Sequence, residues 1–154
     1  GTATGRYALV LFFTPRGMQV DASLVPGSAV TADLHFYPGG PPLRALVGEH
    51  RDTHPTVAVD VPHHTVADAL ATWREVLAQD PWLGSYPVAI HGTTRIAPEP
   101  GLVDDQGESV RLLGGSWVTL LALTGGEPAT VFGELAPTGL LPTALSTEDG
   151  LVVL

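Results

Sequence analysis

The chain lacks cysteine and lysine, and it has no long apolar run. Without cysteine there can be no disulfide, no thiolate-ligated metal and no cysteine nucleophile. The longest apolar run, residues 7–13, is far shorter than the ~20 residues that a membrane-spanning helix needs. Residues 1–5 lack the charged and apolar regions that are typical of a signal peptide. We therefore expect a cytoplasmic protein. Because the sequence does not begin with methionine, we expect residues 1–154 to be a single domain and a fragment of a longer protein.

Basic residues are few and scattered. Sixteen Asp and Glu residues oppose seven Arg residues, which gives a formal net charge of −9 at pH 7. A surface that binds nucleic acid gathers Arg and Lys on one face. The arginines here stand in separate segments: Arg6, Arg16, Arg44, Arg51, Arg74, Arg95 and Arg111. We therefore expect no binding to nucleic acid or to an anionic membrane.

Short apolar runs separated by Gly and Pro predict a β-rich domain of about eight to ten strands. Residues 6–13 predict a central strand, and residues 29–37 alternate between apolar and polar side chains. Residues 43–47 predict a short strand that runs into a polar loop at 48–55.

Two hairpins are predicted in the second half of the chain. The first joins residues 101–103 and 110–113 around the turn at 104–107, and the second joins residues 117–123 and 129–135. Residues 151–154 predict a last strand.

One helix is predicted over residues 65–79. Thr65 and Asp68 have the spacing of a capping box, in which the hydroxyl accepts a free amide and the carboxylate returns to the cap. The apolar residues at helical spacing are Val66, Ala69, Leu70, Trp73, Val76 and Leu77. This stripe must pack on a sheet, and we expect Trp73 and Trp82 to lie in the core. The fold class is therefore α+β and β-dominated, a mostly antiparallel sheet or open barrel with one amphipathic helix packed on it.

No motif in the chain predicts catalysis or a cofactor. His50, Asp52 and His54 are metal-ligand types at close spacing, but we expect them in a loop, which does not bring two imidazoles together, so no metal site is predicted. Whether they bind metal stays open. His63 and His64 are interpreted as polar residues of the loop before the helix.

Nucleophile and phosphate motifs are also missing. Ser116 lacks the glycine two residues later that a nucleophile elbow needs. Asp104 and Asp105 are explained by turn chemistry, and the glycine pairs at 39–40 and 125–126 do not open a helix that could hold phosphate.

The order of motifs resembles the C-terminal region of actinobacterial SWIM zinc-finger family proteins. The most specific segments are DLHFYPG at 33–39 followed by PLRAL at 42–46, and DPWL at 80–83. The zinc finger of that family needs cysteines, so the resemblance assigns no metal ligand to this chain. It implies a non-catalytic assembly module of systems that also contain MoxR-type AAA ATPases and von Willebrand-A proteins.

The sequence thus favours a protein-interaction or structural module of a larger intracellular protein, without catalytic, cofactor or metal residues. Tyr37 and Arg44 are the residues that we expect to face a protein partner. The alternative is a small-molecule binding or hydrolytic domain with a pocket between the helix and the sheet.

Overall fold

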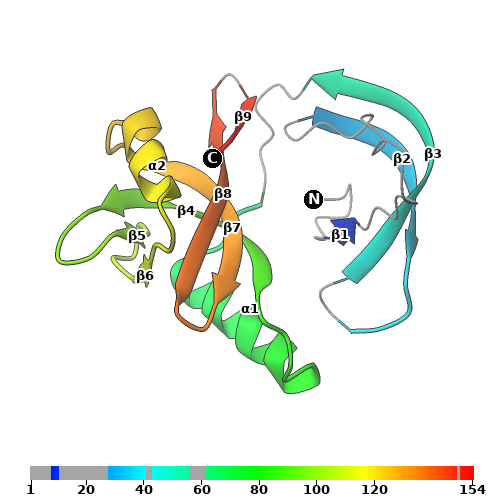
Figure 1. The fold of residues 1–154 in the computed structure, drawn as a ribbon, viewed down its shortest axis with the longest axis horizontal. Coiled ribbons are helices and arrows are strands. Elements are labelled where there is room, and N and C mark those ends of the chain that lie inside the picture. Colours follow the sequence, from blue (N-terminus) through cyan, green and yellow to red (C-terminus); the bar gives the residue numbers. More distant parts are fainter. Residues whose placement is uncertain (1–7, 11–27, 41–42, 56–61, 149) are drawn as a thin grey trace.

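The computed structural model describes residues 8–10, 28–40, 43–55, 62–148 and 150–154, and it is β-dominated, as predicted. Nine strands and two helices lie within these residues. The strands form two sheets, one of three strands and one of six, and both sheets are open (Figure 1). The pairing is antiparallel except between β1 and β3.

The first sheet has the strand order β1-β3-β2. It consists of β1 (Ala8–Val10), β2 (Ser28–Phe36) and β3 (Leu43–Pro55). The alternation at 29–37 is confirmed as a strand. The predicted central strand at 6–13 is described only at β1, which lies at an edge of this sheet.

The polar loop predicted at 48–55 is wrong, because β3 continues to Pro55. Its polar half pairs with the first half of β2, where Thr31 lies opposite Asp52 and Val30 opposite Thr53. Thr31, Asp52 and Thr53 are exposed. Ladder hydrogen bonds come from the backbone, so a strand at the surface tolerates a polar sequence that reads as a loop.

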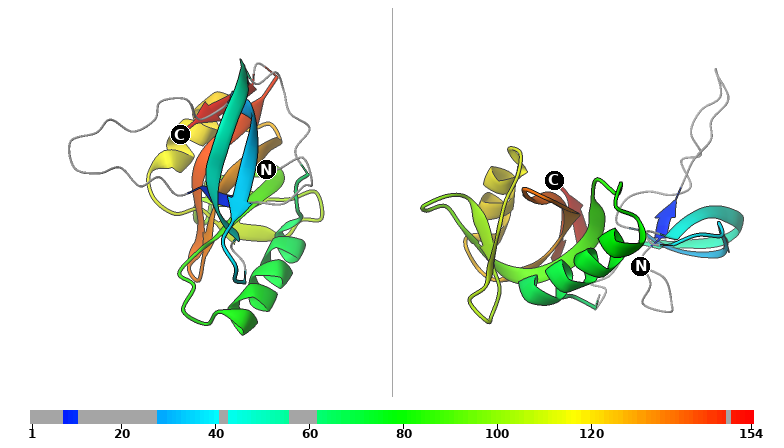
Figure 2. Two further views of the ribbon diagram at one scale, coloured as in Figure 1. Left: turned by 90° about the vertical axis from the view of Figure 1, so that its right-hand side faces the viewer. Right: turned by 90° about the horizontal axis from the view of Figure 1, so that it is seen from below.

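The second sheet has the order β6-β5-β4-β7-β8-β9. Its strands are β4 (Tyr86–Arg95), β5 (Gly101–Val103), β6 (Ser109–Arg111), β7 (Ala129–Ala136), β8 (Gly139–Thr147) and β9 (Gly150–Val153). The β5–β6 hairpin is confirmed. The sheet curls strongly (Figure 2). One parallel bridge from Leu112 to Leu140 brings the residue after β6 back to β8.

Helix α1 (Val66–Gln79) confirms the predicted helix. The Thr65 hydroxyl accepts a hydrogen bond from the backbone N–H of Asp68 at 3.1 Å, which is the first of the two bonds of a capping box. Trp73 is 5% exposed, as expected, but Trp82 is 94% exposed and the prediction of a core position for it is wrong. The helix ends at Gln79, and Trp82 lies in the turn that follows Asp80, beyond the end of the apolar stripe.

Helix α2 (Ser116–Thr124) replaces the strand that was predicted at 117–123. A short apolar run does not distinguish a strand from a helix, and this run has a glycine on each side. Gly115 precedes the first turn, and Gly125 ends the helix with a φ of 61°, which favours glycine. The second predicted hairpin is therefore also wrong, since β7 pairs with β4 and β8.

The core lies between the two helices and the six-stranded sheet. Trp73 of α1, Leu120 of α2 and Ile90 of β4 belong to one buried cluster. The other members are Val66, Ala69, Val88, Leu102, Val110, Leu112, Val131, Leu135, Leu140 and Leu145. In the first sheet, Ala45 is the buried residue among those that the structure describes.

Candidate functional site

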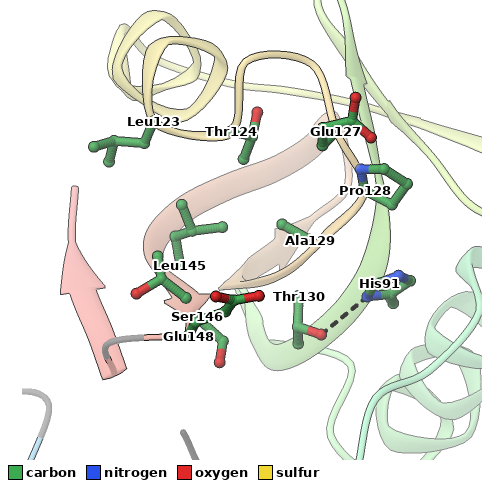
Figure 3. Close-up of a pocket in the computed structure, with 11 residues that line it drawn as sticks. His91, Leu123, Thr124, Glu127, Pro128, Ala129, Thr130, Leu145, Ser146 and Glu148 are labelled. Carbon is green, nitrogen blue, oxygen red and sulfur yellow. Dashed lines mark hydrogen bonds between the residues drawn. The ribbon is translucent and has the colours of Figure 1, made fainter.

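A cavity of about 310 Å³ lies where the C-terminal end of α2 meets the six-stranded sheet. The helix end and the α2–β7 loop lie on one side of it, and strands β7 and β8 on the other (Figure 3). The residues that line it are His91, Leu123, Thr124, Glu127, Pro128, Ala129, Thr130, Leu145, Ser146, Thr147 and Glu148. The pocket considered from the sequence was to lie beside the 65–79 helix, whereas this cavity lies beside α2.

A row of polar side chains crosses the sheet at this cavity. His91 of β4 is paired with Thr130 of β7, which is paired with Ser146 of β8. Directly paired residues of neighbouring strands project on the same face of a sheet. His91 Nδ1 and Thr130 Oγ1 are 3.1 Å apart and share a hydrogen bond (Figure 3). The row therefore offers a ligand an imidazole and two hydroxyls that can donate or accept hydrogen bonds.

His63 stands against His91, with ring centroids 5.1 Å apart and planes tilted by 40°. Its neighbour His64 is held to β4, because the His64 backbone N–H donates to the carbonyl of Ala89 at 2.8 Å. The two histidines were interpreted as polar residues of the loop before the helix. The structure adds that the β4 ladder holds this loop, which places one imidazole beside another.

Two carboxylates stand at the rim of the cavity. Glu127 is in the α2–β7 loop and Glu148 in the β8–β9 turn, and both are exposed. Within the part of the chain that the structure describes, neither side chain has a hydrogen bond or an ion pair. The ion pair between Arg111 and Glu99, at 3.2 Å, lies elsewhere, and both of its side chains are mostly exposed.

The helix end adds a further negative potential. The last turn, at the C-terminal end of α2, lines the cavity through Leu123 and Thr124, and it contains no basic residue. Aligned peptide dipoles give such an end the equivalent of about half a negative charge. Apart from the His91 imidazole, the polar side chains of the lining are carboxylates and hydroxyls.

Asp104 is buried, at 6% exposure, but it has a structural role. Its Oδ2 accepts the backbone N–H of Val66 at 2.8 Å, in the first turn of α1. Its Oδ1 accepts the backbone N–H groups of Gln106 and Glu108 at 3.0 and 2.9 Å. Turn chemistry, which was predicted, explains only the second pair of bonds. The bond to α1 spans 38 residues of sequence, and no local pattern indicated it.

The predicted metal-ligand types lie on β3 rather than in a loop. Asp52 is exposed, and the side chains of His50 and His54 lie outside the described part of the structure. No group of three or more His, Asp or Glu side chains with a geometry suited to a metal ion occurs among the described residues.

The other motifs have structural explanations. Ser116 is the first residue of α2, and the pair Gly125 and Gly126 follows that helix, so it does not open one. Burial raises the pKa of the Tyr86 phenol above its ordinary value. Tyr86 is paired with Leu135 at the end of β4 remote from the cavity, so this shift does not mark the site.

An exposed surface of aromatic and basic side chains forms a second candidate site, here named the aromatic surface: Phe36, Tyr37, Arg44 and Trp82. The first three flank the β2–β3 turn, where the Tyr37 backbone N–H donates to the Arg44 carbonyl at 2.8 Å. All four side chains are exposed.

The turn between β2 and β3 lies beside the C-terminal end of α1 (Figures 1 and 2). Trp82 follows that end, three residues after Gln79. A Cβ atom at Gly40 would lie 3.6 Å from Oε1 of Gln79. The Trp82 backbone is itself fixed, because its N–H donates to Oδ1 of Asp80 at 3.2 Å. Within the described residues, neither helix is long and apolar enough to span a membrane.

Comparison with known proteins does not assign the chain to a group. No known protein family, no curated protein and no solved structure matches its sequence or fold.

Proposed function

We propose that this chain is a non-catalytic protein-interaction module of a larger intracellular protein. The observation that carries this proposal is the aromatic surface, and Trp82 above all, which is 94% exposed on a backbone turn held by Asp80. Trp, Tyr and Arg are the residues that contribute most to the affinity of protein interfaces. A large aromatic side chain on a fixed turn loses little conformational freedom when it is buried by a partner.

The chemistry of the chain supports the same proposal. Sixteen acidic residues against seven basic ones disfavour nucleic acid and anionic lipid as partners. The resemblance to the C-terminal region of SWIM zinc-finger proteins favours an assembly role, with a MoxR-type AAA ATPase or a von Willebrand-A protein as the candidate partner. The zinc finger itself would belong to another part of such a protein.

Site-specific photo-crosslinking tests the proposal. A benzoyl-phenylalanine residue placed at position 82 should give one discrete adduct in cells, while the same residue at Ile96, which is also exposed, should not. The protein in the adduct is then purified and its affinity measured. Trp82→Ser should weaken binding at least tenfold, about 1.4 kcal/mol, with the melting temperature unchanged. Equal adducts at both positions, or equal affinity of the Trp82→Ser chain, would contradict the proposal.

A second candidate function is a small-molecule binding or hydrolytic domain. One observation favours it: the Thr130 hydroxyl lies 3.1 Å from His91 Nδ1, the distance of a nucleophile from its general base. The ring next to His91 is His63 and not the carboxylate that orients a catalytic histidine in a triad. Hydrolysis of p-nitrophenyl acetate by the wild type, lost in Thr130→Val, would favour this function. Equal rates in the two chains would rule out hydrolysis with Thr130 as the nucleophile.

A further inference from the structure

The lining of the cavity at the end of α2 favours a positively charged ligand. Every charged side chain in its lining is a carboxylate, and the remaining polar atoms belong to His91 and to hydroxyls. Arg is absent from the described lining and Lys from the whole chain, so no arginine or lysine of the described residues pairs with these carboxylates in the cavity. A positively charged group is the complement of such a site, because charge-assisted hydrogen bonds to carboxylates are about twice as strong as neutral ones.

The two carboxylates are available for this role. Glu127 and Glu148 have no partner among the described residues, whereas Glu134, on the same strand system, is bonded to Ser85 at 2.8 Å. They come from two separate loops, one after α2 and one after β8, that meet at the cavity (Figure 3). Both carboxylates would attract a cation in the cavity, and the negative end of the α2 dipole would add to that attraction.

The size and the apolar lining restrict the ligand further. About 310 Å³ is at the lower limit of ligand pockets, so the cavity suits a side chain or a molecule of similar size. Leu123, Pro128 and Leu145 provide apolar surface beside the polar row. A methylene chain that ends in a cation can cover such surface while its charged group contacts the carboxylates.

We propose that this cavity binds the cationic group of an arginine or lysine side chain presented by a protein partner, with Glu127 and Glu148 as the charge-pairing residues. The hydroxyls of Thr130 and Ser146 accept hydrogen bonds from the same group. That the cationic group belongs to a protein partner rests on the proposed interaction function. The binding of a cationic group by the cavity does not rest on it.

The test is an NMR titration of the whole chain at low salt. The probe is the tripeptide acetyl-Gly-Arg-Gly-amide, and the matched neutral probe contains citrulline in place of arginine. Saturable shifts at the amides of Thr130, Ser146 and Glu148 are expected with the arginine probe, and the citrulline probe should bind at least about tenfold more weakly. The shifts should diminish with added salt, as attraction between exposed charges does.

Substitutions test whether the arginine probe binds to the carboxylates of the cavity. Glu127→Gln combined with Glu148→Gln should reduce the affinity at least about tenfold. The control is Glu108→Gln combined with Asp105→Asn, which removes two exposed carboxylates from the β5–β6 turn and should change affinity less than about twofold. Free arginine as a third probe distinguishes the two sources: tighter binding of the tripeptide supports a protein segment.

Several results would overturn the proposal. These are equal binding of the citrulline probe, shifts that avoid the cavity, equal losses in the two double variants, or binding of Mg²⁺ or Zn²⁺ in preference to the arginine probe. Failure here would leave the crosslinking at position 82 unaffected, because Trp82 is not part of the cavity lining. The two proposals can therefore fail separately.

Discussion

At the scale of single residues, Asp104 is notable because its side chain accepts three hydrogen bonds from described residues. It joins the β5–β6 turn to the first turn of α1 through three backbone N–H groups. Asp104→Ala would leave the buried N–H of Val66 without a partner, which costs about 1–3 kcal/mol, and it would also remove the acceptor of two part-buried N–H groups in the turn. We expect a loss of roughly 2–4 kcal/mol in the free energy of unfolding.

Urea unfolding followed by far-UV circular dichroism would measure this loss. The matched control is Asp105→Ala, because Asp105 is the exposed neighbour in the same turn and should change stability by less than about 0.5 kcal/mol. Equal stability of the two variants would show that the bond between Asp104 and Val66 contributes nothing.

Trp73 allows a second prediction at this scale. Its side chain is buried in the core cluster, yet its indole N–H has no hydrogen-bond partner among the described residues. Trp73→Ala should cost about 3–5 kcal/mol through the cavity that it leaves. Trp73→Phe removes the unsatisfied donor together with part of the ring, so we expect a change within about 1 kcal/mol of the wild type. Thermal and urea denaturation of both variants would check this, and a phenylalanine variant as unstable as the alanine variant would contradict it.

At the scale of elements, Gly133 shows how closely β7 and β8 approach. It follows a register shift in β7, and a Cβ atom there would lie 2.5 Å from the Leu141 carbonyl oxygen. Backbone cannot move aside as a flexible side chain can. We therefore expect Gly133→Ala to destabilise the protein by about 1–3 kcal/mol.

The control for this prediction is Gly84→Ala. Gly84 lies before β4, where an added Cβ meets nothing within 4 Å, and its φ is not in the left-handed region. A stability unchanged or raised by up to about 1 kcal/mol is expected, because alanine restricts the unfolded chain. Urea midpoints of the two variants would separate close packing from the general effect of replacing a glycine.

The elements themselves differ in how far the sequence predicts them. α1 was predicted because its stripe is long and its cap has a recognisable pattern at Thr65. α2 was not, because nine mostly apolar residues with only Leu120 fully buried show no clear period. The strand predicted at 43–47 ended too early because the second half of β3 is polar, although β3 pairs with β2 as far as Pro55. In both cases the structure depends on contacts with neighbouring strands or loops. Such contacts cannot be inferred from the local amino-acid composition.

The candidate sites were even less accessible to prediction. His91, Thr130 and Ser146 are 39 and 16 residues apart, and only the register of three strands places them in one row. The same holds for the aromatic surface. Tyr37 and Arg44 were predicted to face a partner and are exposed, but Trp82 was assigned to the core because its apolar character was the only signal available.

At the scale of the whole molecule, charge distribution leads to the last prediction, that the chain does not bind nucleic acid. The formal net charge is −9, so approach to a phosphate backbone begins from repulsion. The arginines whose side chains the structure describes are all exposed and stand on different elements: Arg44 on β3, Arg74 on α1, Arg95 on β4 and Arg111 on β6. Arg111 is moreover paired with Glu99.

Binding to DNA or RNA gains its free energy largely from counterions released as Lys and Arg neutralise several phosphates at once. Separate arginines on an acidic surface do not provide that gain. A mobility-shift titration at low salt, where electrostatic attraction is strongest, should show no saturable complex with a mixed-sequence duplex or a single strand. Saturable binding at micromolar concentration that weakens steeply with salt would contradict the prediction. Such a result would mean that the arginines act together on one face. That face would then replace the aromatic surface as the first candidate for partner binding.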